Sequence, residues 1–276
     1  MSKRKPTIQE LKDMKTSGKK FKMITVYDHM MASIVDKSEI ELILVGDSLG
    51  MIIQGHEGTT PVDLEDIQYH LKAVRRGAPN TFVVGDMPFM SYQPSKEDAI
   101  RSAGSLIKLG ADCVKMEGGL GIMDRIEAVT AIGIPVMAHI GLTPQTASSI
   151  GGFKVQGKGT EASEKLLKEA MAAEKAGAFC IVLECIPSQL AKLIEENISI
   201  PTISVGAGPN ATGQNLNAYD ILGIFDAFVP KFVKQYAHMG PEMVSAFNAW
   251  SKDIDEGHYP LKEHEFNMKE EDLPKL

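Results

Sequence analysis

The chain has 276 residues, of which 43% are hydrophobic, and a formal net charge of −7. This length allows a large core and fits either two small domains or one large α/β barrel. The acidic balance argues against nucleic-acid and anionic-membrane partners, and no window approaches the roughly 18 continuous apolar residues of a membrane span.

The basic start at residues 3–5 is followed by no apolar region of the kind found in signal peptides, so a cytoplasmic protein is expected. Cys113, Cys180 and Cys185 lie in apolar runs without C-x-x-C spacing. That usage suits a packed core in a reducing compartment better than a metal site.

Short apolar or β-branched runs recur along the chain, separated by segments with helical spacing. In the segment 95–110, Ser95 stands at an N-cap position, apolar residues from Ala99 to Ile107 form one stripe, and Gly110 ends the helix. Similar helices are predicted in 63–77, 161–177 and 188–197. The runs predicted as strands are 21–28, 42–48, 81–88, 112–118, 135–142, 179–186, 201–208 and 226–232.

The alternation of strands and helices implies parallel pairing, and near-continuous apolar strands imply burial on both faces. Eight such units favour a single (β/α)₈ TIM barrel, a fold of about 250 residues, with a C-terminal helical extension from about residue 240. The alternative is a doubly wound open sheet, whose first turn would be rich in glycine, whereas residues 27–29 read Tyr-Asp-His. No linker divides the chain, so residues 1–276 are predicted to form one catalytic barrel domain.

Acidic side chains stand at the predicted ends of consecutive strands, where barrels carry their chemistry. Asp47, Asp86 and Glu117 would crowd three carboxylates into one sector of the barrel mouth. Such carboxylates repel one another unless a positive charge joins them, and Mg²⁺ suits a site with few carboxylates and open positions for substrate oxygens. Alternatively, one or more of them cap helices or pair with arginines.

Other polar residues end neighbouring strands. Lys115 lies two residues before Glu117, so both side chains share one face of their strand. Glu184 ends an apolar run two strands further on, where a carboxylate facing the metal can take a proton from carbon; the alternative is an ion pair with a neighbouring helix. His139 either holds a substrate oxygen or is an ordinary buried polar residue.

Two glycine-rich loops have different interpretations. GFKVQGKG at 152–159 nearly matches a phosphate-binding P-loop, but Gly159 stands where that motif has a hydroxyl and no strand directly precedes it, so a P-loop is rejected. The longer stretch 143–160 suits a lid or a substrate-binding loop. GAGPNATG at 206–213 lies where many barrels bind phosphate, and a plain tight turn fits it equally well.

The sequence resembles the ketopantoate hydroxymethyltransferase family from about residue 7 to residue 264. The resemblance runs through VGDSLGMIIQGHEGTTPV, YHLKAVRRGAPNTFVVGDMPFMSY, GADCVKMEGG, PVMAHIGLTPQ, GGFKVQGKG, VLECIP and IPTISVGAG. It implies a barrel enzyme that transfers a hydroxymethyl group from 5,10-methylenetetrahydrofolate to 2-oxoisovalerate (3-methyl-2-oxobutanoate). The product is 2-dehydropantoate, in the first step of pantothenate biosynthesis, and the resemblance also implies a homodecamer.

The resemblance assigns roles to the residues at the metal. Asp47 and Asp86 match Mg²⁺ ligands that also hold the substrate, and Glu117 matches a third acidic position, bound directly or through water. Glu184 matches the general base. Mg²⁺ chelated by the keto and carboxylate oxygens would then stabilise the enolate formed when Glu184 removes the methine proton.

The resemblance also implies substrate contacts and exposes a difference. Ser48 and Lys115 match groups that hold the ketoacid, and His139 matches a histidine in the same pocket. Where the family usually has D-G-Q, residues 212–214 read Thr-Gly-Gln, and two following apolar positions are polar, Asn215 and Asn217. These departures affect the expected folate contacts or subunit packing.

Two other functions are compatible with a barrel of this kind. A Mg²⁺-dependent lyase or mutase of the phosphoenolpyruvate and isocitrate lyase type also forms an enolate on a barrel. Isocitrate lyases carry a K-K-C-G-H loop after the fourth strand, whereas residues 117–124 read EGGLGIMD. A non-catalytic ketoacid-binding or scaffold protein is the other alternative, and its function would not require the acidic strand ends.

Overall fold

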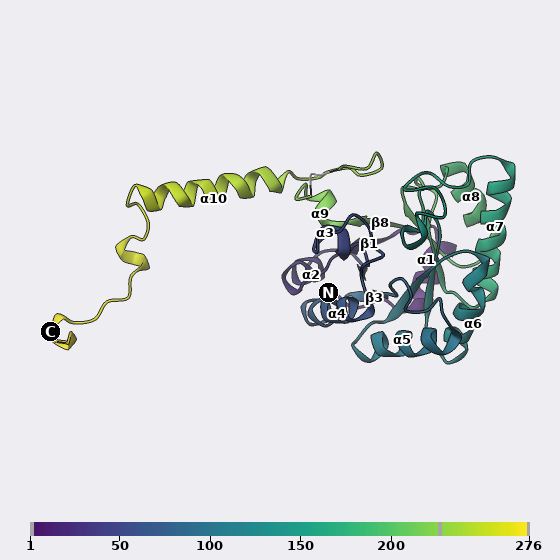
Figure 1. Cartoon of the computed structure of the whole chain (residues 1–276), viewed down its shortest axis with the longest axis horizontal. Coiled ribbons are helices and arrows are strands. Elements are labelled where there is room, and N and C mark those ends of the chain that lie inside the picture. The colour runs from purple at the N-terminus through teal and green to yellow at the C-terminus, as the bar shows by residue number, and fades with distance from the viewer. Residues whose placement is uncertain (1–2, 226–227, 275–276) are drawn as a thin grey trace.

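The computed structural model describes residues 3–225 and 228–274, and in them a closed barrel of parallel strands carries a projecting C-terminal helix (Figure 1). Each strand pairs with the next, and β8 pairs with β1 to close the barrel. The predicted (β/α)₈ fold is confirmed. The strands are β1 (Phe21–Thr25), β2 (Leu42–Val45), β3 (Phe82–Asp86), β4 (Cys113–Glu117), β5 (Val136–Gly141), β6 (Cys180–Glu184), β7 (Thr202–Val205) and β8 (Gly213–Asn217).

Helices surround the barrel and follow the predicted pattern. In α5, Ser95 is the N-cap and its hydroxyl accepts the backbone N–H of Asp98 at 3.0 Å. Gly110 follows this helix with a φ of +103°, a left-handed conformation that favours glycine. The α-helices are α1 (Ile8–Thr16), α2 (His29–Asp36), α3 (Leu49–Ile52), α4 (Leu64–Gly77), α5 (Lys96–Lys108), α6 (Met123–Ala131), α7 (Thr160–Lys175), α8 (Ser188–Asn197), α9 (Ala218–Ile221) and α10 (Met239–Asp255).

The eighth strand is not where the apolar pattern placed it. The prediction of a strand at 226–232 is wrong for 228–232, which form none, and residues 226–227 lie outside the described part. The strand is Gly213–Asn217, whose sequence GQNLN has one apolar residue, Leu216, and none of the β-branched or aromatic residues typical of strands. Tertiary packing selects it: a Cβ at Gly213 would lie 2.4 Å from the Phe21 ring, so only glycine lets β8 approach β1 this closely.

In strands β3 to β6 the residues that point into the barrel change from apolar to titratable along the strand. In β3 they are Phe82, Val84 and Asp86, because alternate residues of a strand share one face. The apolar ends form a core inside the barrel, which Leu11 of α1 closes from below. The charged ends therefore meet at the opposite, carboxyl end of the barrel.

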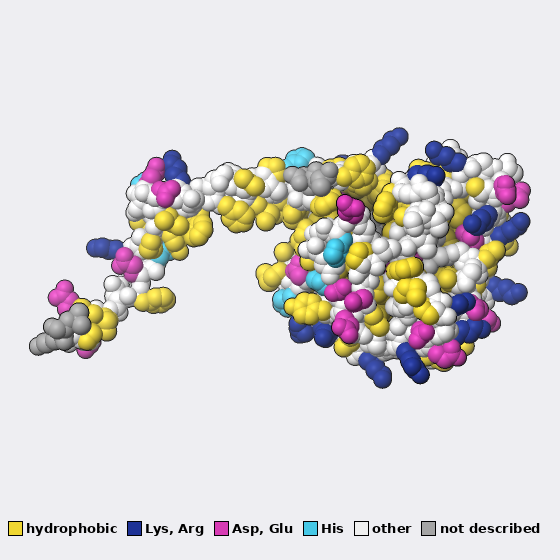
Figure 2. Space-filling view, in the orientation of Figure 1, with side chains coloured by type: hydrophobic (Ala, Val, Ile, Leu, Met, Phe, Trp, Pro, Cys, Tyr) yellow, Lys and Arg dark blue, Asp and Glu magenta, His cyan; other side chains and the backbone are white. Residues whose placement is uncertain are grey.

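The C-terminal helix α10 extends away from the barrel, and none of its residues is buried (Figure 2). Its exposed apolar residues recur at helical spacing and form one face, which we call the α10 apolar face: Met239, Met243, Val244, Phe247, Trp250 and Ile254. This helix confirms the predicted C-terminal extension. Within the described residues, no helix combines the length and the apolar character needed to span a bilayer.

Candidate active site

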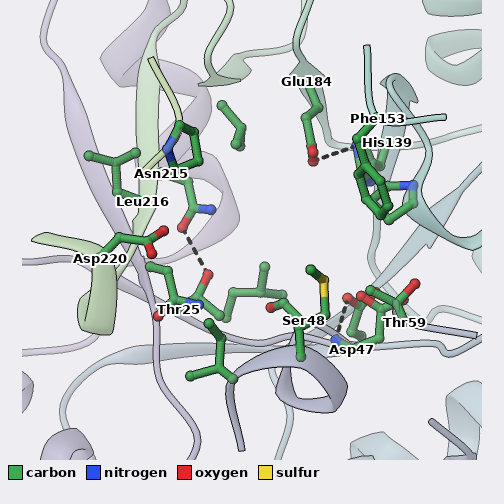
Figure 3. Close-up of a pocket in the computed structure, with 18 of the residues that line it drawn as sticks. Thr25, Asp47, Ser48, Thr59, His139, Phe153, Glu184, Asn215, Leu216 and Asp220 are labelled. Atoms are coloured by element: carbon green, nitrogen blue, oxygen red, sulfur yellow. Dashed lines mark hydrogen bonds and ion pairs between the residues drawn. The ribbon is translucent and has the colours of Figure 1, made fainter. Parts of the chain in front are cut away.

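A cavity of about 230 Å³ opens at the carboxyl end of the barrel (Figure 3). All seven site residues predicted from the sequence line this cavity, so the fold brings them together from β2, β3, β4, β5 and β6. They are Asp47, Ser48, Asp86, Lys115, Glu117, His139 and Glu184.

Asp47 and Asp86 lie side by side and are almost fully buried. The backbone N–H of Asp47 donates to Asp86 Oδ2 at 3.1 Å, and Lys115 Nζ donates to Asp86 Oδ1 at 2.6 Å. Burial raises the pKa of Asp47 well above its usual value, and the charges of Asp86 and Glu117 raise it further. Burial opposes the charge of Lys115, but the carboxylates outweigh it and raise the pKa of this lysine.

His139 connects Glu117 to Glu184. Its Nδ1 lies 3.3 Å from Glu117 Oε2 and its Nε2 lies 3.2 Å from Glu184 Oε2, although neither contact has the alignment of a hydrogen bond. Burial lowers the pKa of His139, but the two carboxylates raise it more, to about 9. The imidazole is therefore protonated at neutral pH. Glu184 was expected to stand apart from the acidic cluster, and instead this ring links the two.

Gln145 joins the loop after β5 to the carboxylates, and the sequence patterns gave it no role. Its Nε2 donates to Asp47 Oδ2 at 2.9 Å, and its backbone N–H donates to Glu117 Oε1 at 2.8 Å. The Tyr92 hydroxyl donates to the Gln145 side-chain oxygen at 2.9 Å. The sequence could not predict this role, because Gln145 meets the carboxylates only when the loop after β5 folds over the strand ends.

Tyr27, also unassigned from the sequence, holds Ser48. The two hydroxyl oxygens lie 2.8 Å apart, and the Asn217 amide donates to the Tyr27 hydroxyl. Thr59 contributes a further polar atom, because its buried Oγ1 has no hydrogen-bond partner among the described residues and the side chain lines the cavity. Tyr27 lies near the end of the predicted strand at 21–28, but the sequence patterns give no signal for the role of either residue.

The donor set fits a divalent cation whose remaining ligands come from water and substrate. Among the described residues, no three His, Cys, Asp or Glu side chains form a ready-made metal cage. Each carboxylate also has a protein partner: Glu117 accepts from the Gln145 backbone, Asp47 from the Gln145 side chain and Asp86 from Lys115. Asp47 and Asp86 form an adjacent pair of buried carboxylates, and Mg²⁺ commonly binds through one or two carboxylates plus substrate oxygens.

The loop predicted as a lid lies over this cavity. Phe153 lines it, and the backbone N–H of Gln156 donates to the carbonyl of Cys185 at 2.9 Å, which ties the loop to the residue after Glu184. Cys185 itself has a φ of +46°, an uncommon value for a residue with a side chain. The loop and the end of β6 are therefore in direct contact.

Comparison with known proteins identifies relatives along nearly the whole chain. A family model described as ketopantoate hydroxymethyltransferase matches residues 5–262. A 3-methyl-2-oxobutanoate hydroxymethyltransferase of Heliobacterium modesticaldum is 54% identical over 97% of this chain and 98% of its own length. One of the same name from Enterococcus faecalis is 51% identical over 99% of both chains.

Solved structures with the same fold are more distant. Phosphonopyruvate hydrolase, in a complex with oxalate and Mg²⁺, aligns with a TM-score of 0.61 and 12% identity over 98% of this chain and 92% of its own. 2,3-Dimethylmalate lyase, a member of the phosphoenolpyruvate mutase and isocitrate lyase superfamily, aligns with a TM-score of 0.58 and 15% identity over 95% and 93%. These similarities show the fold alone. The full-length sequence matches decide the family, and the chain belongs to the ketopantoate hydroxymethyltransferases.

Proposed function

We propose that this chain transfers a hydroxymethyl group from 5,10-methylenetetrahydrofolate to 3-methyl-2-oxobutanoate and forms 2-dehydropantoate, the first step of pantothenate biosynthesis. The observation that carries the proposal is the convergence of buried Asp47, Asp86 and Lys115 with Glu184 at one cavity, in a chain of this family. A single barrel domain spanning residues 1–276 is part of the proposal.

Asp47 and Asp86 would hold Mg²⁺, with Glu117 acting beside them through water. When bound there, the cation supplies positive charge that stabilises negative charge developing on the keto oxygen of the substrate. Lys115 contributes a fixed cation, 2.6 Å from Asp86, toward the substrate carboxylate. Ser48, held by Tyr27 at 2.8 Å, is positioned to donate a hydrogen bond to the ketoacid.

Glu184 accepts the methine proton of the ketoacid in this proposal. Its side chain is 19% exposed, so it reaches the cavity while resting against the strand end. His139, 3.2 Å away, orients the Glu184 carboxylate and lies on the path from it to Glu117. The carbanion character that follows at the branched carbon makes that carbon the nucleophile toward the folate-borne methylene. As the new C–C bond forms, the two bonds from the methylene to folate nitrogens are replaced, water supplies the hydroxyl oxygen, and tetrahydrofolate leaves.

The α10 apolar face supports a homo-oligomer, for which the family resemblance implies a decamer. An exposed apolar face of this kind is unfavourable in water and is typical of a surface that packs against another chain. A cytoplasmic location is proposed with it, in keeping with the unpaired thiols of Cys113, Cys180 and Cys185.

The direct test is the reaction itself. Purified protein is supplied with 3-methyl-2-oxobutanoate and 5,10-methylenetetrahydrofolate, and 2-dehydropantoate is measured by mass spectrometry with Mg²⁺ and with excess chelator. Product only in the presence of the metal is the expected result. Absence of product at any Mg²⁺ concentration, from a protein that is folded by circular dichroism, would refute the proposal.

A further inference from the structure

A second polar wall lines the same cavity, on the side away from the carboxylates. It is built from the ends of β1 and β8 and from α9, and it contains Thr25, Asn215 and Asp220 (Figure 3). Asn215 is buried, and Thr25 Oγ1 donates to its side-chain oxygen at 3.4 Å. The amide nitrogen of Asn215 has no hydrogen-bond partner among the described residues, and the mechanism proposed above uses none of these three groups.

Asp220 is the carboxylate of this wall, and no charged partner stands beside it in the described residues. Its carboxylate points from α9 into the cavity toward Asn215 and Thr25, while Glu184 enters from another side (Figure 3). No hydrogen bond or ion pair reaches this carboxylate within the described residues. Burial alone raises the pKa of Asp220 to about 6, so the group is ionised at neutral pH without a cation beside it. A desolvated carboxylate in this state costs free energy that a ligand with N–H donors can offset.

We propose that Asp220 binds the pterin ring of the one-carbon carrier through the ring N3–H and the 2-amino group, with the Asn215 amide beside it. This inference rests on the proposed function. The pyrimidine edge of a reduced pterin presents two adjacent N–H donors, and a carboxylate has two oxygens at a matching spacing that act only as acceptors.

The charges of the two walls assign the two substrates to different places. The ketoacid carries its own carboxylate, which Asp220 would repel and which Lys115 attracts on the opposite wall. A neutral ring rich in N–H donors has the reverse preference. The charges therefore assign the ketoacid to the wall with Lys115 and the pterin ring to the wall with Asp220.

Aromatic side chains give the same wall a surface for a planar ring. Phe225, Phe228 and Phe232 follow α9 and line the cavity, and Phe153 of the loop after β5 lines it across from Asp220, beside His139 (Figure 3). Phe228 and Phe153 are 69% and 56% exposed, so these rings are available to a ligand. Aromatic side chains pack well on the faces of planar rings, while Asp220 addresses the edge.

Asp220→Asn tests the proposal, because it keeps the shape of the side chain but turns one acceptor into a donor that faces a donor edge. The binding of tetrahydrofolate is measured by calorimetry in the presence of Mg²⁺ and ketoacid. The loss of one hydrogen bond to a charged group, with the remaining one no longer charge-assisted, predicts binding about 10- to 100-fold weaker than in the wild type. Asp13→Asn, on the exposed surface of α1, is the matched control and should bind normally.

A second ligand separates direct contact from an indirect effect. With a tetrahydrofolate analogue that lacks the 2-amino group, the wild type should bind more weakly and the penalty of Asp220→Asn should shrink at least several-fold. Binding of tetrahydrofolate by Asp220→Asn at wild-type strength would overturn the inference. An equal penalty for both ligands would overturn it too, because the carboxylate would then act elsewhere.

Exchange of the ketoacid methine proton in D₂O, measured without folate, separates failure of this inference from failure of the proposed function. Asp220→Asn should retain the wild-type exchange rate, because the base and the metal carboxylates are untouched. A wild-type protein that shows neither exchange nor product refutes the proposed function and this inference with it. If the wild type shows exchange and turnover but Asp220→Asn binds tetrahydrofolate as strongly as the wild type, this inference alone is refuted.

Discussion

Gln145→Met is the substitution whose effect follows most directly from the contacts of the site. The Gln145 amide nitrogen donates to Asp47 Oδ2 and to the Met87 carbonyl, both at 2.9 Å. Its oxygen accepts from the Tyr92 hydroxyl at 2.9 Å and from Gln93 Nε2 at 3.0 Å. Methionine preserves the length of the side chain and removes all four hydrogen bonds.

The expected loss of stability comes mainly from two buried acceptors, the Asp47 oxygen and the Met87 carbonyl, which lose their donor. Each such group costs about 1–3 kcal/mol when it is left unpaired. Water entering from the cavity recovers part of this, so the free energy of unfolding should fall by about 2–4 kcal/mol. At roughly 2–4 °C per kcal/mol for a large domain, the Tm should fall by roughly 5–15 °C.

The assay is thermal unfolding followed by circular dichroism, combined with calorimetric titration of Mg²⁺. Burial, then Asp86 and Glu117, raise the pKa of Asp47, and the Gln145 amide opposes that rise. Gln145→Met should therefore weaken Mg²⁺ binding as well as stability. Gln54→Met, at an exposed glutamine, is the control and should change neither. A Tm within 2 °C of the wild type, together with unchanged Mg²⁺ affinity, would refute the role given to Gln145.

Three further predictions follow from the same site. Chelation should abolish activity and Mg²⁺ restore it, and Asp47→Asn or Asp86→Asn should weaken metal binding while circular dichroism still shows a folded barrel; full activity in excess chelator would refute the metal. Amide hydrogen exchange across residues 145–160 should slow when ketoacid and folate bind, because the loop lies over the cavity, and identical exchange with both ligands bound would mean a static loop. The Asp220 pKa of about 6 lies above the unfolded value of about 3.9, so the folded state resists ionisation and loses stability as pH rises through this range. After allowance for its solvent exposure, Asp220→Asn should gain at most about 1–2 kcal/mol at pH 7.5 and less at pH 5, as measured by urea unfolding at each pH. A loss of stability at pH 7.5 would contradict this reasoning.

The barrel and its acidic mouth were readable from sequence because both depend on local patterns. Runs of β-branched residues ending in a charged side chain, as at Asp86 and Glu184, mark a strand and its carboxyl end at once. The eighth strand was not readable, since Gln214 and Asn215 take strand conformation through pairing with β1 rather than through propensity.

The polar residues that support the site were missed for a related reason. Tyr27, Tyr92 and Gln145 act through partners that are 21 to 98 positions away in the chain, at Ser48, Glu117 and Asp47. No spacing rule connects such pairs, because the barrel closure brings them together. The wall around Asp220 could likewise not be predicted from the sequence, because only the folded barrel places Asp220 in the same cavity as Asp47, Asp86 and Glu117.

The central claim is that Glu184 takes the methine proton of the ketoacid, and exchange of that proton in D₂O tests it most directly. Enolisation needs only the base and the metal, so the wild type with Mg²⁺ should exchange the proton of 3-methyl-2-oxobutanoate without folate. Glu184→Gln keeps the shape of the side chain but cannot accept a proton. This variant should still bind Mg²⁺ and ketoacid, while exchange, followed by proton NMR, slows by about two to four orders of magnitude. An undiminished exchange rate would contradict the claim and move the base elsewhere. Loss of exchange together with ketoacid binding would also contradict it, because Glu184 would then hold the pocket together.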